Sequence, residues 1–430
     1  MRAFCCILPL THLDCTELLV NDRIAVSFAA LCAVTACTST DPTGGSAAVS
    51  DSAGITIVEN RGPYNEWRLA ADPEVRIGTV EGDSAYQFHR VQFAGRLSDG
   101  RIVVADGSYQ VRWFDPDGTF RSATGGRGSG PGEFGTMVGF ILTPADTLVI
   151  HDSRNLRATW LSPAEAFVRD IPLRGIASGS QSRLLVLTAD DRLALSVSTT
   201  PFGELRPDFT YVRDTLSVLS ASAAGIDTVV RRPGRDNAIW AAFSGGRMDR
   251  FQVFGMPFAR EVAAAATADG YAIADGGTGE IRHHDWTGAL TRIARQPGLG
   301  GDLLTSDDKA SFVEHTVDAA RQRGNTNLSV MEESARLQMD IIPEGHTMPT
   351  FAELLSDVEG RIWLRDYAPV WVDETEYAWT VFGPDGRVER RVVTPVDLRV
   401  LHVGPEYVTG VERDSLDVEY VAVHRLVPGS

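Results

Sequence analysis

Residues 97–123 read LSDGRIVVADGSYQVRWFDPDGTFRSA and decide the fold. Three runs rich in β-branched and aromatic residues, RIVVAD, VRWFD and TFRSA, are separated by short segments that contain Asp-Gly and other turn-forming residues. This spacing is typical of antiparallel strands joined by hairpin turns, and not of strands that alternate with helices. The stretch therefore predicts a unit of strand, turn, strand, turn, strand.

The same unit recurs along the chain. Clear copies begin at Leu142 (LTPADTLVIHD), Thr267 (TADGYAIAD) and Leu355 (LSDVEGRIWLRD), a weaker copy begins at Thr188 (TADDRLALS), and a degenerate copy occupies residues 400–427. Repeats of this length, built from short strands, are typical of β-propellers, in which each repeat is one four-stranded blade. We therefore predict an all-β, six-bladed β-propeller over residues 53–430.

The spacing of the turn aspartates leaves the blade count open. Successive turns at Asp99, Asp146 and Asp190 are 47 and 44 residues apart, but the next two spacings are 79 and 88 residues. Residues 305–342 of the second long gap change to a helical period, and Thr305 with Asp308 resembles a capping box, which predicts a small helical insertion. The first long gap is rich in strand formers, so seven blades remain an alternative.

A propeller must also close its ring. Each blade is too small to bury both faces alone, so the first and last blades have to pack against each other. We expect residues 55–59 or 75–78 to complete a blade that otherwise ends with the C-terminal strand at residues 420–427.

The N-terminal region resembles an export signal. Arg23 precedes an apolar run of 11 residues, 24–34, and small residues then lead to Cys37. This order of charge, apolar core and small residues is typical of a secretory signal, and the run is roughly half the length needed to cross a bilayer as a helix. We interpret residues 1–36 as a signal peptide whose start is set about 19 residues too early.

The residues VTAC at positions 34–37 resemble a bacterial lipobox, in which the cysteine carries lipid after cleavage. Residues 37–52 are rich in Ser, Thr, Gly, Ala and Asp and are expected to form a flexible tether. We therefore expect an exported protein, lipid-anchored to the cell envelope through Cys37. An ordinary signal peptide cut nearby is the alternative.

Composition excludes other classes. The 57 acidic and 40 basic residues give a net charge of -17, which disfavours nucleic acid. All five cysteines lie at or before position 37, so the body holds no disulfide framework. The sequence also contains no HExxH or GxSxG motif.

Residues 125–134, GGRGSGPGEF, connect one unit to the next. With this connector, residues 86–134 resemble an NHL-type propeller repeat. The order of elements, with a helical insertion before the strand that contains Trp363, resembles bacterial exported six-bladed β-propellers. These resemblances imply a fold and no activity. The connector includes a formal GxGxxG motif but no following helix, so a tight link between blades is a better interpretation than a phosphate site.

An aspartate ends the second strand of four units, and these residues are Asp106, Asp152, Asp275 and Asp366. Equivalent positions in a ring lie at one face, where converging carboxylates would bind a cation such as Ca²⁺. The alternative is that each aspartate caps its own turn. His89, Arg90 and His151 are further candidates for the channel mouth.

These patterns favour a binding or scaffold module for a peptide, glycan or envelope protein partner, without an assigned catalytic residue. The alternative is a cation-dependent hydrolase or lyase with its site at the central channel. Convergence of the four aspartates would favour the enzyme, and capping of their own turns would favour the binding module.

Overall fold

The computed structural model describes residues 37–40, 45–176, 181–187, 192–201, 205–295 and 301–429. The chain divides into two units, residues 1–35 and 36–430, and all described residues belong to the second. The expected signal peptide and the turn of the weaker repeat copy, residues 188–191, lie outside the described residues.

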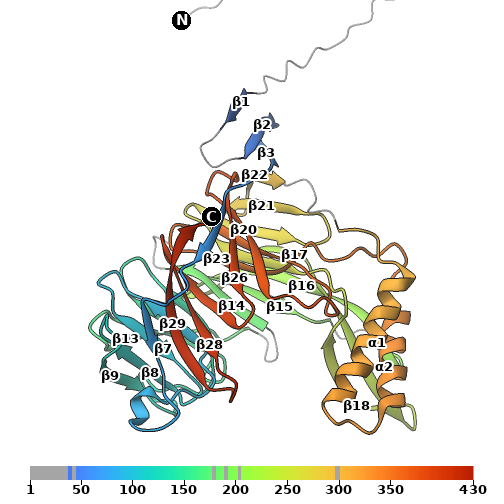
Figure 1. The fold of residues 1–430 in the computed structure, drawn as a ribbon, viewed down its shortest axis with the longest axis horizontal. Helices are drawn as coiled ribbons and strands as arrows, with labels where there is room; N and C mark the ends of the chain where they lie inside the picture. Colours follow the sequence, from blue (N-terminus) through green and yellow to red (C-terminus); the bar gives the residue numbers. More distant parts are fainter. Residues whose placement is uncertain are drawn as a thin grey trace, which may run out of the picture. The chain divides into compact units, whose positions relative to one another are not determined.

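The first two repeats form two sheets of four antiparallel strands each (Figure 1). Their strands are β6 (Phe93–Arg96), β7 (Ile102–Ala105), β8 (Gln110–Phe114) and β9 (Phe120–Gly125) in blade 1, and β10 (Met137–Leu142), β11 (Leu148–Asp152), β12 (Arg157–Leu161) and β13 (Phe167–Pro172) in blade 2.

The next two sheets carry additional strands. Blade 3 consists of β14 (Gln181–Leu187), β15 (Leu193–Thr199) and the long strands β16 (Asp208–Ser222) and β17 (Gly225–Ser244), followed by β18 (Arg247–Gly255). Blade 4 consists of β19 (Val262–Ala266), β20 (Gly270–Asp275), β21 (Glu280–Asp285) and β22 (Leu290–Arg295). The first long gap in the repeat is therefore an elongated blade plus the first strand of its neighbour, and not a seventh blade.

The last two sheets are joined to N-terminal strands. Blade 5 consists of β23 (Phe351–Ser356), β24 (Ile362–Asp366), β25 (Glu376–Phe382) and β26 (Val388–Pro395), with β4 (Glu66–Leu69) at its edge. Blade 6 consists of β27 (Leu398–Val403), β28 (Tyr407–Arg413) and β29 (Glu419–Pro428), completed by β5 (Val75–Ile77). One of the two segments expected to close the ring does so: β5 pairs antiparallel with β29.

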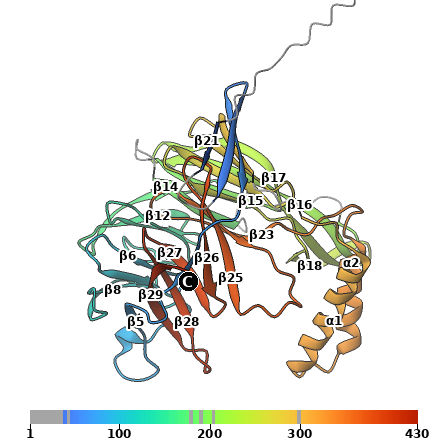
Figure 2. The same cartoon turned by 45° about the horizontal axis from the view of Figure 1, so that its top comes forward.

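The other candidate segment has a different position. β3 (Ile55–Arg61) pairs in parallel with β22 of blade 4, and β2 (Ser46–Ser52) and β1 (Cys37–Thr40) extend that sheet outward (Figure 2). Residues 46–52, expected to belong to a tether, therefore form a strand. Ala47 of β2 is buried, and the strand forms a full antiparallel ladder with β3, so backbone pairing outweighs the polar composition.

Six hydrophobic cores, one between each pair of neighbouring blades, close the ring. Residues of β7 show how one strand serves two cores: Val103 packs toward blade 2, and its neighbours Ile102 and Val104 pack toward blade 6. Successive side chains of a strand point to opposite faces, so a strand between two blades reads as a continuous apolar run. Six cores with the last joining blade 6 to blade 1 fix the count at six blades.

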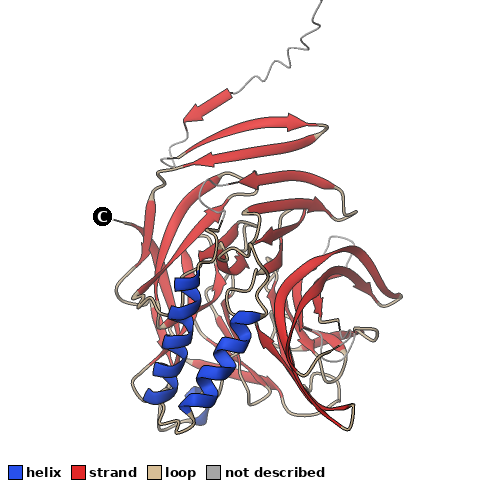
Figure 3. Cartoon of the chain, turned by 90° about the vertical axis from the view of Figure 1, so that its right-hand side faces the viewer, coloured by secondary structure: helices blue, strands red, loops and turns tan. Residues whose placement is uncertain are grey.

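The helical insertion lies between blades 4 and 5 and consists of α1 (Ser306–Gln322) and α2 (Leu328–Asp340), which run side by side (Figure 3). Thr305 caps α1 in a capping box with Asp308. The buried residues Val313 and Met339 of the helices pack with Phe258, which follows β18. Within the described residues, no helix is long and apolar enough to cross a membrane.

The first strands of the blades surround the centre of the ring and contact one another, β10 with β14, β14 with β19, β19 with β23 and β27 with β6. Each first strand ends at a turn, and the antiparallel second strand returns to the opposite end. The two ends of the channel are called the turn end and the aspartate end. The turn end carries the first turns of the blades, including residues 143–147, 267–268 and 357–360. The aspartate end carries Asp106, Asp152, Asp275 and Asp366.

Candidate functional site

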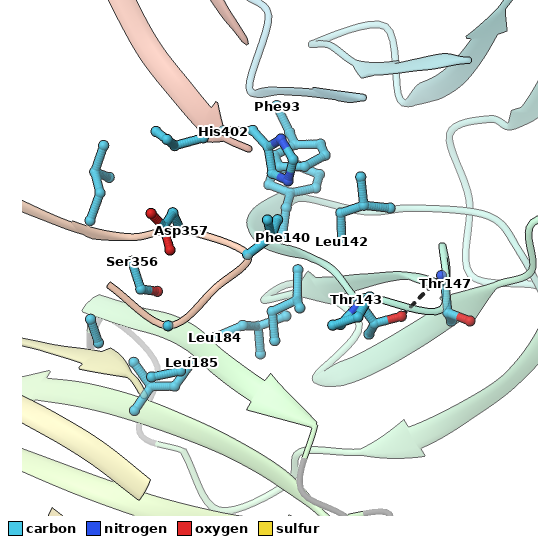
Figure 4. Close-up of a pocket in the computed structure, with 18 of the residues that line it drawn as sticks. Phe93, Phe140, Leu142, Thr143, Thr147, Leu184, Leu185, Ser356, Asp357 and His402 are labelled. Atoms are coloured by element: carbon cyan, nitrogen blue, oxygen red, sulfur yellow. Dashed lines mark hydrogen bonds between the residues drawn. The ribbon is translucent and has the colours of Figure 1, made fainter. Parts of the chain in front are cut away.

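A cavity of about 990 Å³ lies at the centre of the ring and reaches the turn end (Figure 4). Residues of all six first strands line it, and the first turns of blades 2, 4 and 5 form its rim. Its size is within the range of pockets that bind small molecules. The first-strand residues of the wall are Phe93, 140–142, 183–185, 265–266, 355–356 and 401–403.

Two phenyl rings form the most distinctive part of the wall. Phe93 of blade 1 and Phe140 of blade 2 stack with their centroids 5.3 Å apart and an interplanar angle of 11°. The ring of His402 from blade 6 meets Phe93 edge-on at 6.1 Å. Aromatic faces of this kind provide a large, rigid apolar contact area.

Neither ring nitrogen of His402 has a hydrogen-bond partner in the part of the chain that the structure describes, a property that His402 shares with His283 of β21. Burial lowers the pKa of His402 to about 4, although the charge of Asp357 acts in the opposite direction. The side chain is therefore neutral at pH 7. This part of the wall is uncharged, and its polar atoms are unsatisfied, which is rare for buried nitrogens.

Backbone bulges bring extra side chains into the cavity. The ladder between β27 and β28 shifts register between Val400 and His402, and that between β14 and β15 shifts between Leu184 and Val186. In a regular strand, neighbouring side chains point to opposite faces, but here Leu401 and His402 both line the cavity. A bulge changes the direction of the side chains beside it, and here bulges occur on β27 and β14, two of the strands that line the cavity.

The polar rim is fixed by hydrogen bonds within its own turns. Asp357, fully buried, accepts bonds from the backbone N–H groups of Glu359 and Arg361, from Arg361 Nε at 2.5 Å and from Trp363 Nε1 at 3.0 Å. At the opposite side of the rim, Thr147 N–H donates to Thr143 Oγ1 at 3.0 Å. Because its oxygens are already occupied, Asp357 shapes the cavity mouth and is not available as a free carboxylate.

The predicted aspartates lie at the other end and serve the blades. Asp152 is completely buried and accepts five hydrogen bonds, from the backbone N–H groups of Gly135, Thr136, Arg154 and Asn155 and from Asn155 Nδ2. It therefore fixes both its own turn and the connector from blade 1. Asp106 accepts from the N–H groups of His89 and Ser108 and pairs with Arg112 at 3.0 Å.

The other two aspartates are also engaged locally. Asp275 accepts from Gly277 N–H at 2.9 Å, and Asp366 bonds to Arg391. None of the four lines the cavity, and among the described residues no group of three or more His, Cys, Asp or Glu side chains could hold a metal ion. Asp106, Asp152 and Asp275 therefore bind backbone N–H groups of their own turns, Asp366 pairs with Arg391 of β26, and the four side chains do not form a common metal site.

The remaining sequence candidates also lie away from the cavity. His89 and Arg90 are exposed, and the bond from Gly107 N–H to the His89 carbonyl places this segment beside Asp106. His151 is buried on β11, and burial lowers its pKa. Sequence reasoning missed Phe93, Phe140 and His402, because only their positions on the innermost strands, combined with the bulges, would have identified them.

The glycine-rich connector has the predicted structural role. Phe134 N–H donates to the Gly126 carbonyl at 2.8 Å, and the Phe134 ring is fully buried in the core between blades 1 and 2. The strand β10 follows it, and not a helix. The GxGxxG motif is therefore not followed by the helix N-terminus that a phosphate site requires.

No family model matches the sequence, and no curated protein matches it. Among solved structures, the chain is similar to a putative exported protein from Bacteroides fragilis, with 11% identity, a TM-score of 0.43 and coverage of 85% of this chain and 99% of that one. It is similar to a member of the duf4221 family from Bacteroides vulgatus, with 9% identity, a TM-score of 0.44 and the same coverage. Virginiamycin B lyase from Staphylococcus aureus matches with 9% identity, a TM-score of 0.34 and coverage of 91% and 94%.

Proposed function

We propose that this protein is an exported, lipid-anchored binding module whose ligand occupies the central cavity at the turn end. The observation that carries the proposal is the wall of that cavity, where six strands from six blades converge around about 990 Å³. The sequence favoured a peptide, glycan or protein partner. We propose a small molecule with an apolar body in its place, because the stacked Phe93 and Phe140 rings favour apolar contact.

Binding is a better proposal than metal-assisted hydrolysis. The carboxylates that would hold a cation already accept hydrogen bonds from backbone or side-chain donors, as the five donors on Asp152 illustrate. A cation would have to displace those donors and leave buried N–H groups without acceptors, which costs about 1–3 kcal/mol for each group. No observation on the described residues favours the hydrolase or lyase alternative.

The test uses a neutral aromatic probe, N-phenyl-1-naphthylamine, whose fluorescence rises in an apolar environment. It is titrated into the protein and into Ser356→Phe, which adds a ring at a position lining the cavity (Figure 4). The matched control is Ser84→Phe, at an exposed residue outside the cavity. The proposal predicts saturable binding with about one probe per chain, lost in Ser356→Phe and retained in Ser84→Phe.

Two outcomes would overturn the proposal. Absence of saturable binding by the wild-type protein would show that the cavity does not accept an apolar ligand. Equal binding by the wild-type protein and Ser356→Phe would place the probe elsewhere, for example on the exposed Phe251 and Met248 of β18.

The anchoring part of the proposal rests on residues 24–37 of the sequence. Expression of the full chain in a bacterium with radiolabelled palmitate should label the wild-type protein and not Cys37→Ala. Cys32→Ala, which removes a cysteine inside the apolar run, is the matched control and should keep the label. Labelling that persists in Cys37→Ala would contradict lipidation at this position.

A further inference from the structure

Arg183 crosses the centre of the ring. It comes from β14 of blade 3, and its Nη1 donates to the carbonyl oxygen of Leu354 on β23 of blade 5 at 2.7 Å. The strand β19 of blade 4 contacts both β14 and β23, so it stands between them in the ring. The guanidinium group therefore bridges two blades that are not neighbours, and it lines the cavity.

This guanidinium group is exposed to the cavity and lacks an anionic partner among the described residues. Its side chain is exposed, and the bond to Leu354 uses one of its donors. Within the described part of the chain, no carboxylate forms an ion pair with Arg183. The nearby carboxylate of Glu353 pairs with Arg365 at 3.3 Å instead. An arginine has five N–H donors arranged in a fork that fits carboxylates and sulfonates.

The surroundings strengthen attraction to an anion. The blades that enclose the cavity keep water away from part of the Arg183 side chain and so lower its pKa, and the charge of Glu353 partly offsets this effect. A guanidinium group nonetheless stays protonated in proteins. Because water screens charge less effectively inside a cavity than at an open surface, an unpaired positive charge there interacts strongly with a negative group.

The acidic residues of the rim oppose this attraction only weakly. Asp357 and Glu359 line the cavity, and Arg361 bonds to both at 2.5 Å, which balances one of their two negative charges. The Glu359 side chain is 48% exposed, so water and salt screen the other charge. Arg169 also lines the cavity and lies over the ring of Trp160 at 4.7 Å. Because Arg361 pairs with the rim carboxylates and Arg183 has no anionic partner among the described residues, the interior is favourable to a negative group.

We propose that the ligand is a small amphipathic anion, with an organic carboxylate, sulfonate or similar group bound by Arg183 and an apolar body held against Phe93 and Phe140. This inference rests on the proposed function, since it names the chemical class of the molecule in the same cavity. Arg183 supplies selection for charge, and the phenyl rings supply contact area.

The test compares two probes that share one aromatic skeleton. 8-Anilino-1-naphthalenesulfonate carries a sulfonate, and N-phenyl-1-naphthylamine does not. Both are titrated into the wild-type protein and into Arg183→Gln, Arg183→Lys and the control Arg90→Gln, which removes an exposed arginine outside the cavity. Ser356→Phe reports in every case whether the probe is inside the cavity.

The wild-type protein should bind the sulfonate about tenfold more tightly than the neutral probe, as a charge-assisted hydrogen bond to an unpaired arginine predicts. Arg183→Gln should remove this preference, so that it binds the two probes with equal affinity. Arg183→Lys should retain part of the preference, and Arg90→Gln should retain all of it.

Equal affinity of the wild-type protein for the two probes would overturn this inference and leave the proposed function intact. A preference for the sulfonate that survives in Arg183→Gln would also overturn it. Loss of both probes in Arg183→Gln and in Arg183→Lys would assign Arg183 a purely structural role as a link between blades 3 and 5. If neither probe binds the wild-type protein, the proposed function itself fails.

Discussion

The two ends of the channel differ in how their polar groups are satisfied. At the aspartate end, Asp152 accepts five hydrogen bonds, and Asp106 accepts bonds from two backbone N–H groups and an arginine. At the turn end, His402 has two ring nitrogens without a partner among the described residues, and Arg183 uses one donor on a backbone carbonyl. Among these described residues, Asp106 and Asp152 are therefore satisfied by protein donors, whereas Arg183 keeps donors that can bind a ligand.

This difference distinguishes polar side chains that stabilise the fold from polar side chains that can bind a ligand. A buried polar group without a partner costs free energy, so a fold retains it only where something else depends on it. Charged residues that recur at equivalent blade positions attract attention in a sequence, but their recurrence reflects the same turn built several times. The groups available for a ligand occur once each and do not follow the repeat.

The largest effect on stability is expected at the aspartate end. Asp152→Ala should lower the free energy of unfolding by about 3 kcal/mol, because it leaves several buried donors without an acceptor. Urea denaturation of the purified protein, residues 37–430, measures this. Asp152→Asn keeps part of the acceptor capacity and should lose less. A loss below about 1 kcal/mol in Asp152→Ala would contradict a structural role for this residue.

The next largest effect is a pH dependence of the free energy of unfolding, caused by His402 at the turn end. The pKa of His402 is about 4 in the folded protein, below the ordinary value of 6.5, so the folded state binds fewer protons than the unfolded state between these values. His402 therefore lowers the free energy of unfolding as the pH falls from about 6.5 toward 4. Between pH 7 and pH 5 the loss is about 2 kcal/mol at most.

The measurement compares urea denaturation of the wild-type protein and His402→Leu at pH 7 and pH 5. His402→Leu should lose about 1–2 kcal/mol less than the wild-type protein over this interval. The pKa of His283 is also about 4, but His283 is present in both proteins and its contribution cancels. The control His89→Leu changes an exposed side chain and should follow the wild-type protein. Identical slopes for the wild-type protein and His402→Leu would contradict the neutral, buried state of His402.

A smaller effect is expected at Asp366, which is only partly buried. The Asp366 side chain is 40% exposed and pairs with Arg391, itself 30% exposed. A solvent-screened pair of this kind contributes less than about 1 kcal/mol. Asp366→Ala should therefore change the free energy of unfolding by less than one third of the Asp152→Ala effect. Equal effects of the two substitutions would contradict the expectation that a buried aspartate stabilises the fold more than a partly exposed one.

The smallest effect concerns metal ions. Because the aspartates are occupied by hydrogen bonds, treatment with a chelator followed by Ca²⁺ should shift the melting temperature by less than about 1 °C. A cation that binds only the folded protein would raise the melting temperature reversibly. A stoichiometric metal with such a shift, lost in the double variant Asp106→Ala and Asp275→Ala, would show that these residues have a cation role.

The repeat predicted the fold well, and the site poorly. The Asp-Gly turns at 99–100 and 117–118 mark the hairpins of blade 1, because such turns need residues that adopt their backbone conformation, and Gly100 and Gly118 have positive φ. The helical insertion followed from periodicity, and the capping box at Thr305 is present. Both features depend on local residues, which a single sequence contains.

The site depends on features that are not local. His402 and Leu401 line the cavity together only because a bulge shifts the ladder between β27 and β28. Phe93 and Phe140 stack only because blades 1 and 2 pack beside each other. Arg183 bonds to a carbonyl 171 residues away. A repeat pattern gives the blades and their order, but not the inward direction of these side chains.

The central claim is that the cavity at the turn end, and not the aspartate end, binds the ligand. A crystal of the protein soaked with a brominated naphthol tests it most directly, because anomalous scattering locates the bromine. A bromine peak is expected in the cavity, within contact distance of Phe93 or Phe140, and no peak is expected there in Ser356→Phe. A peak beside Asp106 or Asp275 instead, with an empty cavity, would contradict the account.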